Sequence, residues 1–346
     1  MPRTIKFAVG GDIMLLSQLL VGGPFVTVDG ASAPSPGITV LGDRITFKTH
    51  DIIMRHIRIR SSSKIQSVNS TGAAGGTTTD QRDSLQFDGN VDGTQPGYNY
   101  LLENCSVSWG VDENMEIYGL NTHDVVVCNC IFSEGLAHSI HWKSNDPAHN
   151  YKSHSAGLIM GPGTYNIIVE GNLFAQNTFR NPAISGGAHA VVANNLIYNP
   201  GNTDMNIYPD ASVGGTYLSA VSNVLIAGPS KNPGSSTFYT FDNHVLNLGS
   251  QIYFQDNVSV GVVAFSTTEV ATNYPVGTTP FVSTPPEPAL LAKVNPLNPV
   301  DVEDYVVERV GARPTERDAT DTRIINDVIL GTGAIINVPP DPRVAP

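Results

Sequence analysis

A short sequence phrase returns along the middle of the chain, between residues 98 and 201 in its clearest form, and it constrains the fold more than any other feature. The phrase is a run of apolar residues, one small polar residue, and a second apolar pair. The intervals between its copies are 25, 42, 23 and 28 residues, so the period lies in the low to middle twenties, and 42 spans two copies. The polar position, which we expect to form a corner, falls at Cys105, Cys130, Asn172, Asn195 and Asn223.

Repeats of this length cannot each bury an apolar face alone, so they must stack on their neighbours. Their apolar runs, such as Val125 to Val127, are too short for helices and rich in β-branched residues, which favours strands. A leucine-rich repeat has a similar period but needs a regular leucine ladder, which the sequence lacks. The pattern therefore predicts an all-β solenoid of parallel strands, a β-helix.

The composition fits one elongated domain. Charged residues make up only 14% of the 346 residues and there are 33 glycines, which suits tight corners between stacked strands. We expect a β-helix over residues 1–300, interrupted by inserted loops at 61–82, 89–97 and 138–152. Loops inserted into a regular stack usually build the binding face.

The C-terminal region has a different pattern. Val302 to Val310, followed by Gly311, and Glu316 to Leu330, followed by Gly331, predict two helices. We expect residues 301–346 to form a helical cap or tail that packs on the β-helix, because the open end of a strand stack needs protection.

The charge balance limits the partners. With 31 acidic and 19 basic residues the net charge is −12, which argues against a nucleic-acid partner because phosphates attract a basic face. A polyanionic substrate would need a cation between it and the protein. No segment is apolar for long enough to span a bilayer. The N-terminal residues read as a strand and not as a signal peptide, so a secreted protein with this sequence would have lost its leader or would be exported differently.

The three cysteines, Cys105, Cys128 and Cys130, all lie in the repeat. Cys128 and Cys130 are expected on one side of one strand, with Cys105 one coil away. We therefore predict a ladder of small buried thiols, and a disulfide between neighbouring coils stays open.

Acidic residues of the middle coils give the first chemical signal. Asp112 and Glu116 are four residues apart, which on a strand places both side chains on one face, and Asp83 lies one coil earlier. Three carboxylates form a site for a hard cation, and Ca²⁺ suits oxygen ligands with loose geometry. Two alternatives stay open: a glycosidase acid and nucleophile pair, or surface acids that promote solubility.

The second signal is Arg180, which follows a predicted strand at the same edge as Asp112 and precedes Asn181-Pro182. Pro182 fixes the local chain and biases Asn181 toward an extended conformation. In a groove beside a cation, Arg180 would contact a sugar acid; otherwise it is a solvated turn residue.

Four histidines lie in or beside the third insertion, and imidazole is a common zinc ligand. Their spacing matches no zinc motif, so a zinc site is disfavoured. These histidines are His138, His141, His149 and His154.

Several segments, in this order, resemble the pectate lyase family and in particular its bacterial branch, which has a Ser-Trp-Gly-x-Asp-Glu-Asn coil. They are Cys105 to Asn114, Ile131 to Leu136, Lys152 to Gly157, Asn172 to Ala175 with Arg180 to Pro182, Asn194 to Asn199, and the tail from Arg313 to Gly333. The resemblance covers most of the chain. It implies a right-handed parallel β-helix and a secreted enzyme that cleaves polygalacturonate, the acidic polysaccharide of pectin, by β-elimination.

The resemblance also implies roles for single residues. Asp83, Asp112 and Glu116 fall on the family's acids, which bind Ca²⁺ and through it the substrate's C6 carboxylate. Arg180 falls on the arginine that the family is held to use to take the C5 proton. Because a guanidinium stays protonated in proteins, the alternative is that Arg180 stabilises the developing charge while another group accepts the proton. Lys152 matches a lysine of the bacterial branch and would act as a catalytic residue that replaces the charge of the lysine which several members have at the position of Ala156; otherwise it is an exposed loop lysine.

The loop and its flank supply the expected substrate contacts, His154 and Trp142, whereas Trp109 is expected to pack in the core. Departures from the family pattern include Gln81 two residues before Asp83, Ala156 where several members have lysine, and Ala183 and Ser185 where a further basic residue often follows. They keep an alternative function open, a non-catalytic polysaccharide-binding β-helix such as an adhesion or phage-tail module.

Overall fold

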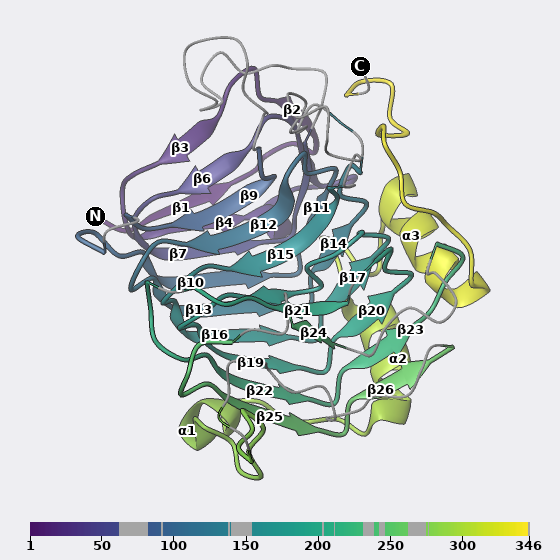
Figure 1. Ribbon diagram of the computed structural model, residues 1–346. Helices are drawn as coiled ribbons and strands as arrows, with labels where there is room; N and C mark the ends of the chain where they lie inside the picture. The colour runs from purple at the N-terminus through teal and green to yellow at the C-terminus, as the bar shows by residue number, and fades with distance from the viewer. Residues whose placement is uncertain are drawn as a thin grey trace, which may run out of the picture.

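In a computed structural model, the chain forms a parallel β-helix of three sheets, and each coil gives one strand to each sheet in turn (Figure 1). The residues described are 1–61, 82–90, 93–137, 139, 154–202, 204–210, 212–230, 239–241, 246–261, 275 and 277–344. Every strand pair among them is parallel, and strands neighbouring in a sheet are three apart along the chain. The prediction of a right-handed parallel β-helix is confirmed.

Within these described ranges, the strands divide into three sheets. The first, sheet A, contains β1 (Arg3–Lys6), β4 (Val26–Asp29), β7 (His50–Arg55), β10 (Tyr98–Glu103), β13 (His123–Cys128), β16 (Tyr165–Glu170), β19 (His189–Ala193), β22 (Tyr217–Val221) and β25 (Gln251–Gln255). Sheet B contains β2 (Gly11–Met14), β5 (Ile38–Gly42), β8 (Ile57–Ser61), β11 (Ser106–Ser108), β14 (Ile131–Ser133), β17 (Leu173–Ala175), β20 (Leu196–Tyr198), β23 (Val224–Ile226) and β26 (Val258–Val260). Sheet C contains β3 (Leu19–Val21), β6 (Ile45–Phe47), β9 (Leu85–Asp88), β12 (Glu113–Tyr118), β15 (Ala156–Met160), β18 (Ala183–Ile184), β21 (Met205–Ile207) and β24 (Tyr239–Phe241).

The predicted corner positions stack between sheets A and B. Asn172 Nδ2 donates to Asn195 Oδ1 over 3.0 Å, and Asn195 Nδ2 donates to Asn223 Oδ1 over 2.9 Å. Earlier in the stack, the backbone N–H of Cys105 donates to Cys130 Sγ over 3.4 Å. Because these side chains bind the same position of the next coil, the corner positions seen in the sequence are confirmed. The 42-residue interval is one coil and not two copies, since Cys130 N donates directly to Asn172 Oδ1 over 2.9 Å and β13 pairs directly with β16.

The residue before each corner adopts a left-handed backbone. Asn104, Asn129 and Asn194 have φ angles of 46°, 53° and 57°. Asparagine tolerates this conformation better than most residues with a side chain, which explains the asparagine pairs in the repeat.

A residue with the same left-handed backbone divides one segment that its apolar pattern predicts to be a single strand. The segment Ile52 to Arg60 reads as a single strand in the sequence, but β7 ends at Arg55 and β8 begins at Ile57. His56, with a φ of 57°, turns the chain between them. The arginines of this segment therefore lie on two sheets and not along one strand.

A left-handed residue also separates two of the cysteines that were expected on one strand. Asn129 separates Cys128, at the end of β13, from Cys130 at the corner, so the two do not share a strand. Cys105 and Cys130 are buried and stacked on adjacent coils, as the thiol ladder predicts, and all three cysteines are free thiols.

Inward-facing apolar side chains fill the coils. A continuous row on sheet B is fully buried and in register: Val107, Phe132, Phe174, Ile197 and Leu225. Each such side chain contributes about 1.5–3 kcal/mol through burial. The expected core position of Trp109 is also confirmed, since only 1% of this residue is exposed.

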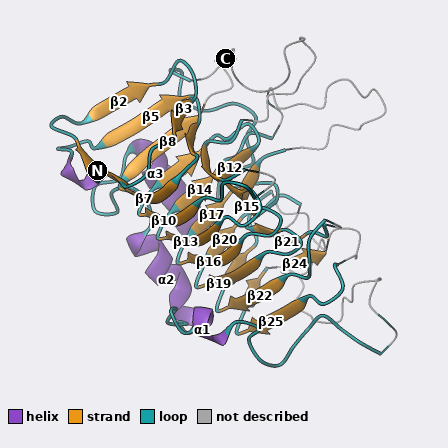
Figure 2. Ribbon diagram, turned by 90° about the vertical axis from the view of Figure 1, so that its left-hand side faces the viewer, coloured by secondary structure: helices purple, strands orange, loops and turns teal. Residues whose placement is uncertain are grey.

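The short helical segments are η1 (Gly30–Ser32), α1 (Pro288–Leu291), α2 (Pro299–Arg309) and α3 (Ala319–Leu330). The two predicted C-terminal helices are confirmed as α2 and α3. They lie along the outer face of sheet B and not across the end of the stack, in contrast to a cap (Figure 2). The reason is that sheet B also has apolar side chains on its outer face, and these pack against the helices: Ile131, Leu173, Leu196 and Val224 against Val302, Val306, Ile324 and Val328.

The first coil leaves apolar residues accessible. Ile5, Ile13 and Leu19 are exposed, and together with residues of the next coils, such as Val26 and Phe47, they line an open pocket of about 350 Å³ whose lining is almost wholly apolar. None of the helices in the described ranges is long and apolar enough to cross a membrane.

Candidate active site

The predicted site residues gather where strands of sheet C begin. Strands β9, β12, β15 and β18 are neighbours in that order. Asp83 precedes β9, Asp112 precedes β12, His154 precedes β15 and Arg180 precedes β18. Because parallel strands begin at the same edge, residues up to 97 positions apart in the chain lie side by side, and backbone bonds such as Ala156 N to Asp112 O (3.3 Å) and Leu158 N to Arg180 O (2.8 Å) hold that edge together.

Two of the acids are joined by a glutamine. Gln86 on β9 is opposite Glu116 on β12 in the register of the sheet. Its Nε2 donates to Asp83 Oδ2 over 2.6 Å and to Glu116 Oε2 over 2.7 Å. The other carboxylate oxygen of Asp83 accepts from the backbone N–H of Glu113 over 3.0 Å. The amide therefore holds two carboxylates close together.

Burial and mutual repulsion make this acid pair unusual. Burial, followed by the charge of Asp112, raises the pKa of Asp83 to about 8, although the Arg44 guanidinium opposes the shift. Burial, followed by the charge of Asp83, raises the pKa of Glu116 well above its ordinary value. The site thus concentrates negative charge out of water, where a bound cation would offset it.

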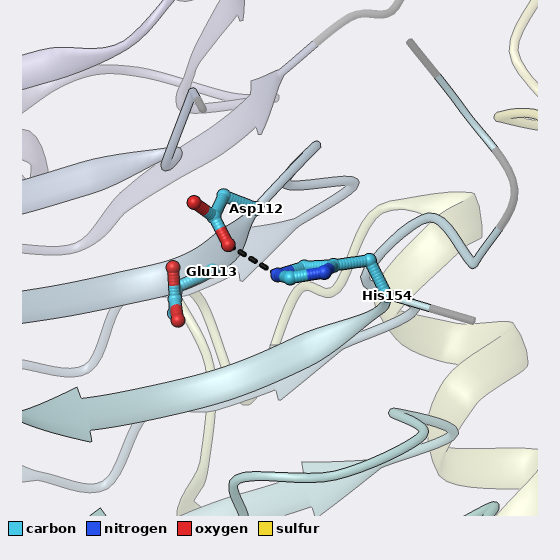
Figure 3. Close-up of side chains that lie close together, drawn as sticks. All are labelled: Asp112, Glu113 and His154. Carbon is cyan, nitrogen blue, oxygen red and sulfur yellow. Dashed lines mark hydrogen bonds and ion pairs between the residues drawn. The ribbon is translucent and has the colours of Figure 1, made fainter. Parts of the chain in front are cut away.

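Asp112 connects this pair to a second group (Figure 3). Candidate ligand atoms of Asp112, Glu113 and His154 all lie within 4.8 Å of one another. His154 Nε2 and Asp112 Oδ1 form a hydrogen bond. The side chain of His154 is 21% exposed, so it reaches the surface beside the acids.

Arg180 is held by several contacts. Its backbone has a φ of 59°, and its N–H donates to Asn206 Oδ1 over 2.7 Å. Its guanidinium forms an ion pair with Glu113, whose residue is only 3% exposed. The guanidinium carbon also lies 5.0 Å from the ring centre of Phe179 and 5.4 Å from that of Tyr208. These contacts fix a positive charge next to the acids.

The structure therefore brings together Asp83, Asp112, Glu116, His154 and Arg180, which sequence analysis selected. The remaining two selected residues, Lys152 and Trp142, lie outside the described residues.

Sequence analysis missed Glu113 and Gln86. Even spacing on a strand puts Glu113 on the face opposite Asp112 and Glu116. However, β12 begins only at Glu113, so Asp112 lies in the preceding bend, and its ligand atom comes within 4.8 Å of those of Glu113 and His154. The available signal was the adjacency of two acids, Asp112 and Glu113, at a predicted corner. Gln86 carried no comparable signal, since only its register with Glu116 reveals its role.

Comparison with known proteins finds relatives that share the name probable pectate lyase C. It is 30% identical over 329 residues to a probable pectate lyase C of Aspergillus terreus, covering 94% of this chain and 67% of that protein. Probable pectate lyases C of Aspergillus flavus and Neosartorya fischeri are 29% identical over 328 and 352 residues, covering 94% and 97% of this chain and 67% and 69% of theirs. These relatives are fungal, so the expectation of a bacterial branch is not supported. No family model matches the chain.

Solved structures share the fold. A pectate lyase studied for its substrate specificity and anti β-elimination mechanism superimposes with a TM-score of 0.56 at 14% identity, covering 86% of this chain and 70% of that one. A pectate lyase bound to a hexasaccharide gives 0.56 at 14% identity, with 86% and 69% covered. Jun a 1, the major allergen from cedar pollen, gives 0.52 at 13% identity, with 89% and 80% covered.

Proposed function

Because this chain belongs to the pectate lyase family and is a polysaccharide lyase, we propose that it is a calcium-dependent enzyme that cleaves polygalacturonate, or a related uronic-acid polymer, by β-elimination. One observation carries the proposal: the starts of adjacent sheet C strands bring buried carboxylates and a fixed guanidinium to one edge. An acidic sugar needs both a cation held by the acids and a positive side chain.

The donor set fits Ca²⁺. Asp83, Asp112 and Glu116 offer only hard oxygen atoms, and the charge of Asp112 contributes to the raised pKa of the other two carboxyls. When bound, Ca²⁺ would neutralise the substrate's C6 carboxylate and make the C5 proton more acidic. The protein's part is to hold these acids close together, where burial and mutual repulsion disfavour their ionised forms until a cation is bound.

Arg180 supplies the second charge. In β-elimination a base such as solvent water takes the C5 proton, and negative charge develops on the C6 carboxylate. The C4–C5 double bond then forms as the bond from C4 to the glycosidic oxygen breaks, and that oxygen takes up a proton. A guanidinium stays protonated in proteins and is therefore a poor proton acceptor. We therefore assign to Arg180 the stabilisation of the developing negative charge, with Glu113, Phe179 and Tyr208 fixing its position.

The proposed partner is an acidic polysaccharide. With a net charge of −12 the protein repels such a polymer except where cations are held, which restricts productive binding to this edge. His154 lies at the same edge, beside Asp112, and is the described residue that we assign to substrate binding. Since the substrate is a polymer outside cells, the proposal includes a secreted protein.

The test is the ultraviolet absorbance of the unsaturated product formed from polygalacturonate, with added CaCl₂ or with a chelator. We expect product with calcium, little with chelator, and little from Asp83→Asn or Arg180→Ala. Asp301→Asn, which changes an exposed acid on α2, is the matched control and should keep full activity. Product formed at an equal rate in chelator would refute the calcium proposal. Absence of product from every uronic polymer would leave a polysaccharide-binding module, whereas new reducing ends without absorbance would indicate a hydrolase.

A further inference from the structure

We propose that the side-chain amide of Gln86 is an additional ligand of the cation, and that the amide group rotates by half a turn when the ion binds. The inference rests on the proposed cation site formed by Asp83, Asp112 and Glu116. It adds a neutral oxygen ligand to those acids and a rearrangement that accompanies binding.

The position of the amide carries the argument. Gln86 Nε2 lies 2.6 Å from Asp83 Oδ2 and 2.7 Å from Glu116 Oε2. Calcium contacts its oxygen ligands at about 2.3–2.6 Å, so an ion that touches both carboxylates must also meet this amide. The amide must therefore either leave or become a ligand.

The surroundings of Gln86 favour a ligand. Gln86 lies in the middle of β9, with Thr46 on β6 and Glu116 on β12 as its register partners on the two sides. Its Oε1 accepts from Thr46 Oγ1 over 2.7 Å. Leaving would break this bond and both bonds to the acids, whereas a half-turn of the amide keeps the side chain in place and exchanges its two ends.

Thr46 permits both orientations. A hydroxyl has one donor and two acceptor positions. Without an ion, Thr46 donates to Gln86 Oε1 and accepts from Gln18 Nε2 over 2.8 Å. After the turn, it accepts from Gln86 Nε2 as well as from Gln18. The amide of Gln86 therefore keeps Thr46 as a partner in both orientations, although the Thr46 O–H gives up its acceptor after the turn. The charge at the site decides between the two orientations: carboxylates alone attract the amide N–H groups, and a cation attracts the amide oxygen.

A neutral oxygen is also suited to this place. Calcium takes about six to eight oxygen ligands, and the acids here already repel one another. The amide of Gln86 adds an oxygen without a further negative charge.

The experiment is calorimetric titration of the full chain with CaCl₂, which measures binding without activity. We expect Gln86→Leu, which keeps the approximate size but has no ligand atom, to lower calcium affinity roughly tenfold or more. Gln86→Glu keeps an oxygen at the position and should bind at least as tightly as the wild type. Asp83→Asn, which removes a charged ligand, should abolish binding.

The outcomes are distinct. If Gln86→Leu binds within threefold of the wild type, or more tightly, Gln86 is no ligand and the inference is overturned while the proposed function stands. Equal losses in Gln86→Leu and Gln86→Glu would show a structural role and would also overturn it. If the wild type binds no calcium, the proposed cation site falls together with this inference. If Gln86→Leu does not fold, a crystal structure of the wild type grown with CaCl₂ decides, since Oε1 either contacts the ion or faces away from it.

Discussion

Removal of one side chain from the asparagine ladder should weaken the whole stack. Asn195 is fully buried and its side chain takes part in four hydrogen bonds. Its Oδ1 accepts from the backbone N–H and from Nδ2 of Asn172, at 2.9 and 3.0 Å. Its Nδ2 donates to Val169 O and to Asn223 Oδ1, both at 2.9 Å. Asn195→Ala deletes all four and leaves buried partners behind.

The size of the effect follows from these contacts. At a net contribution of about 1 kcal/mol each, four hydrogen bonds amount to roughly 4 kcal/mol, a large part of the 5–15 kcal/mol that keeps a typical protein folded. The entropy of unfolding, near 2.1 cal/mol/K per residue, gives roughly 0.7 kcal/mol/K for 346 residues. The expected fall in Tm is therefore about 6 °C.

Two further variants test the reasoning by calorimetry or circular dichroism. Asn257→Ala removes a similar set of bonds, to Asn223 and Ala220, at the partly exposed end of the ladder, where water replaces them. It should cost less than half as much. Asn195→Cys copies the corner of earlier coils, where Cys130 Sγ accepts a backbone N–H, and should lie between Ala and the wild type.

A Tm within 2 °C of the wild type for Asn195→Ala, or equal losses for Asn195→Ala and Asn257→Ala, would refute the claim that buried side-chain bonds hold the coils together.

Two other predictions concern the site, and a third concerns Glu170 at the end of β16. Arg180→Ala should lower kcat by roughly 10²–10³-fold, which is typical when one group that stabilises transition-state charge is removed. Glu113→Gln should cause a smaller loss, because the guanidinium of Arg180 keeps its aromatic contacts. Both variants are measured by steady-state kinetics on polygalacturonate, and an unchanged kcat for Arg180→Ala would contradict the assignment. Chelator treatment should lower the Tm of the wild type but not that of Asp83→Asn, since an ion that binds only the folded state stabilises it; equal shifts in both would place the ion elsewhere. Burial raises the pKa of Glu170, so the folded state holds this proton more tightly than the unfolded state and the contribution of Glu170 to stability falls as pH rises from about 4.5. Glu170→Gln should therefore gain Tm relative to the wild type at pH 7 and show little gain at pH 4, whereas an equal gain at both values would indicate an effect unrelated to ionisation.

Much of the fold was predictable from the sequence because a solenoid is built from local repeats. The corner positions, from Cys105 to Asn223, recur at intervals that reflect one physical need: each coil must place a small polar group where it can bind the next. The C-terminal helices were likewise visible, since glycine follows each of them, and Gly331 ends α3 with a φ of 68°. Their place along sheet B was not, because it depends on which apolar residues face outward from short strands.

The site divides in the same way. The sequence by itself selected Asp83, Asp112, Glu116 and Arg180, through the spacing of the acids and the family resemblance, while surface and turn roles stayed open for them. Only the tertiary structure decided that Glu113 pairs with Arg180 and that Gln86 lies between Asp83 and Glu116. Those contacts depend on the strand register and on the residue at which β12 begins. A shift of one residue in either changes the face on which a side chain lies, and local sequence does not fix such a shift.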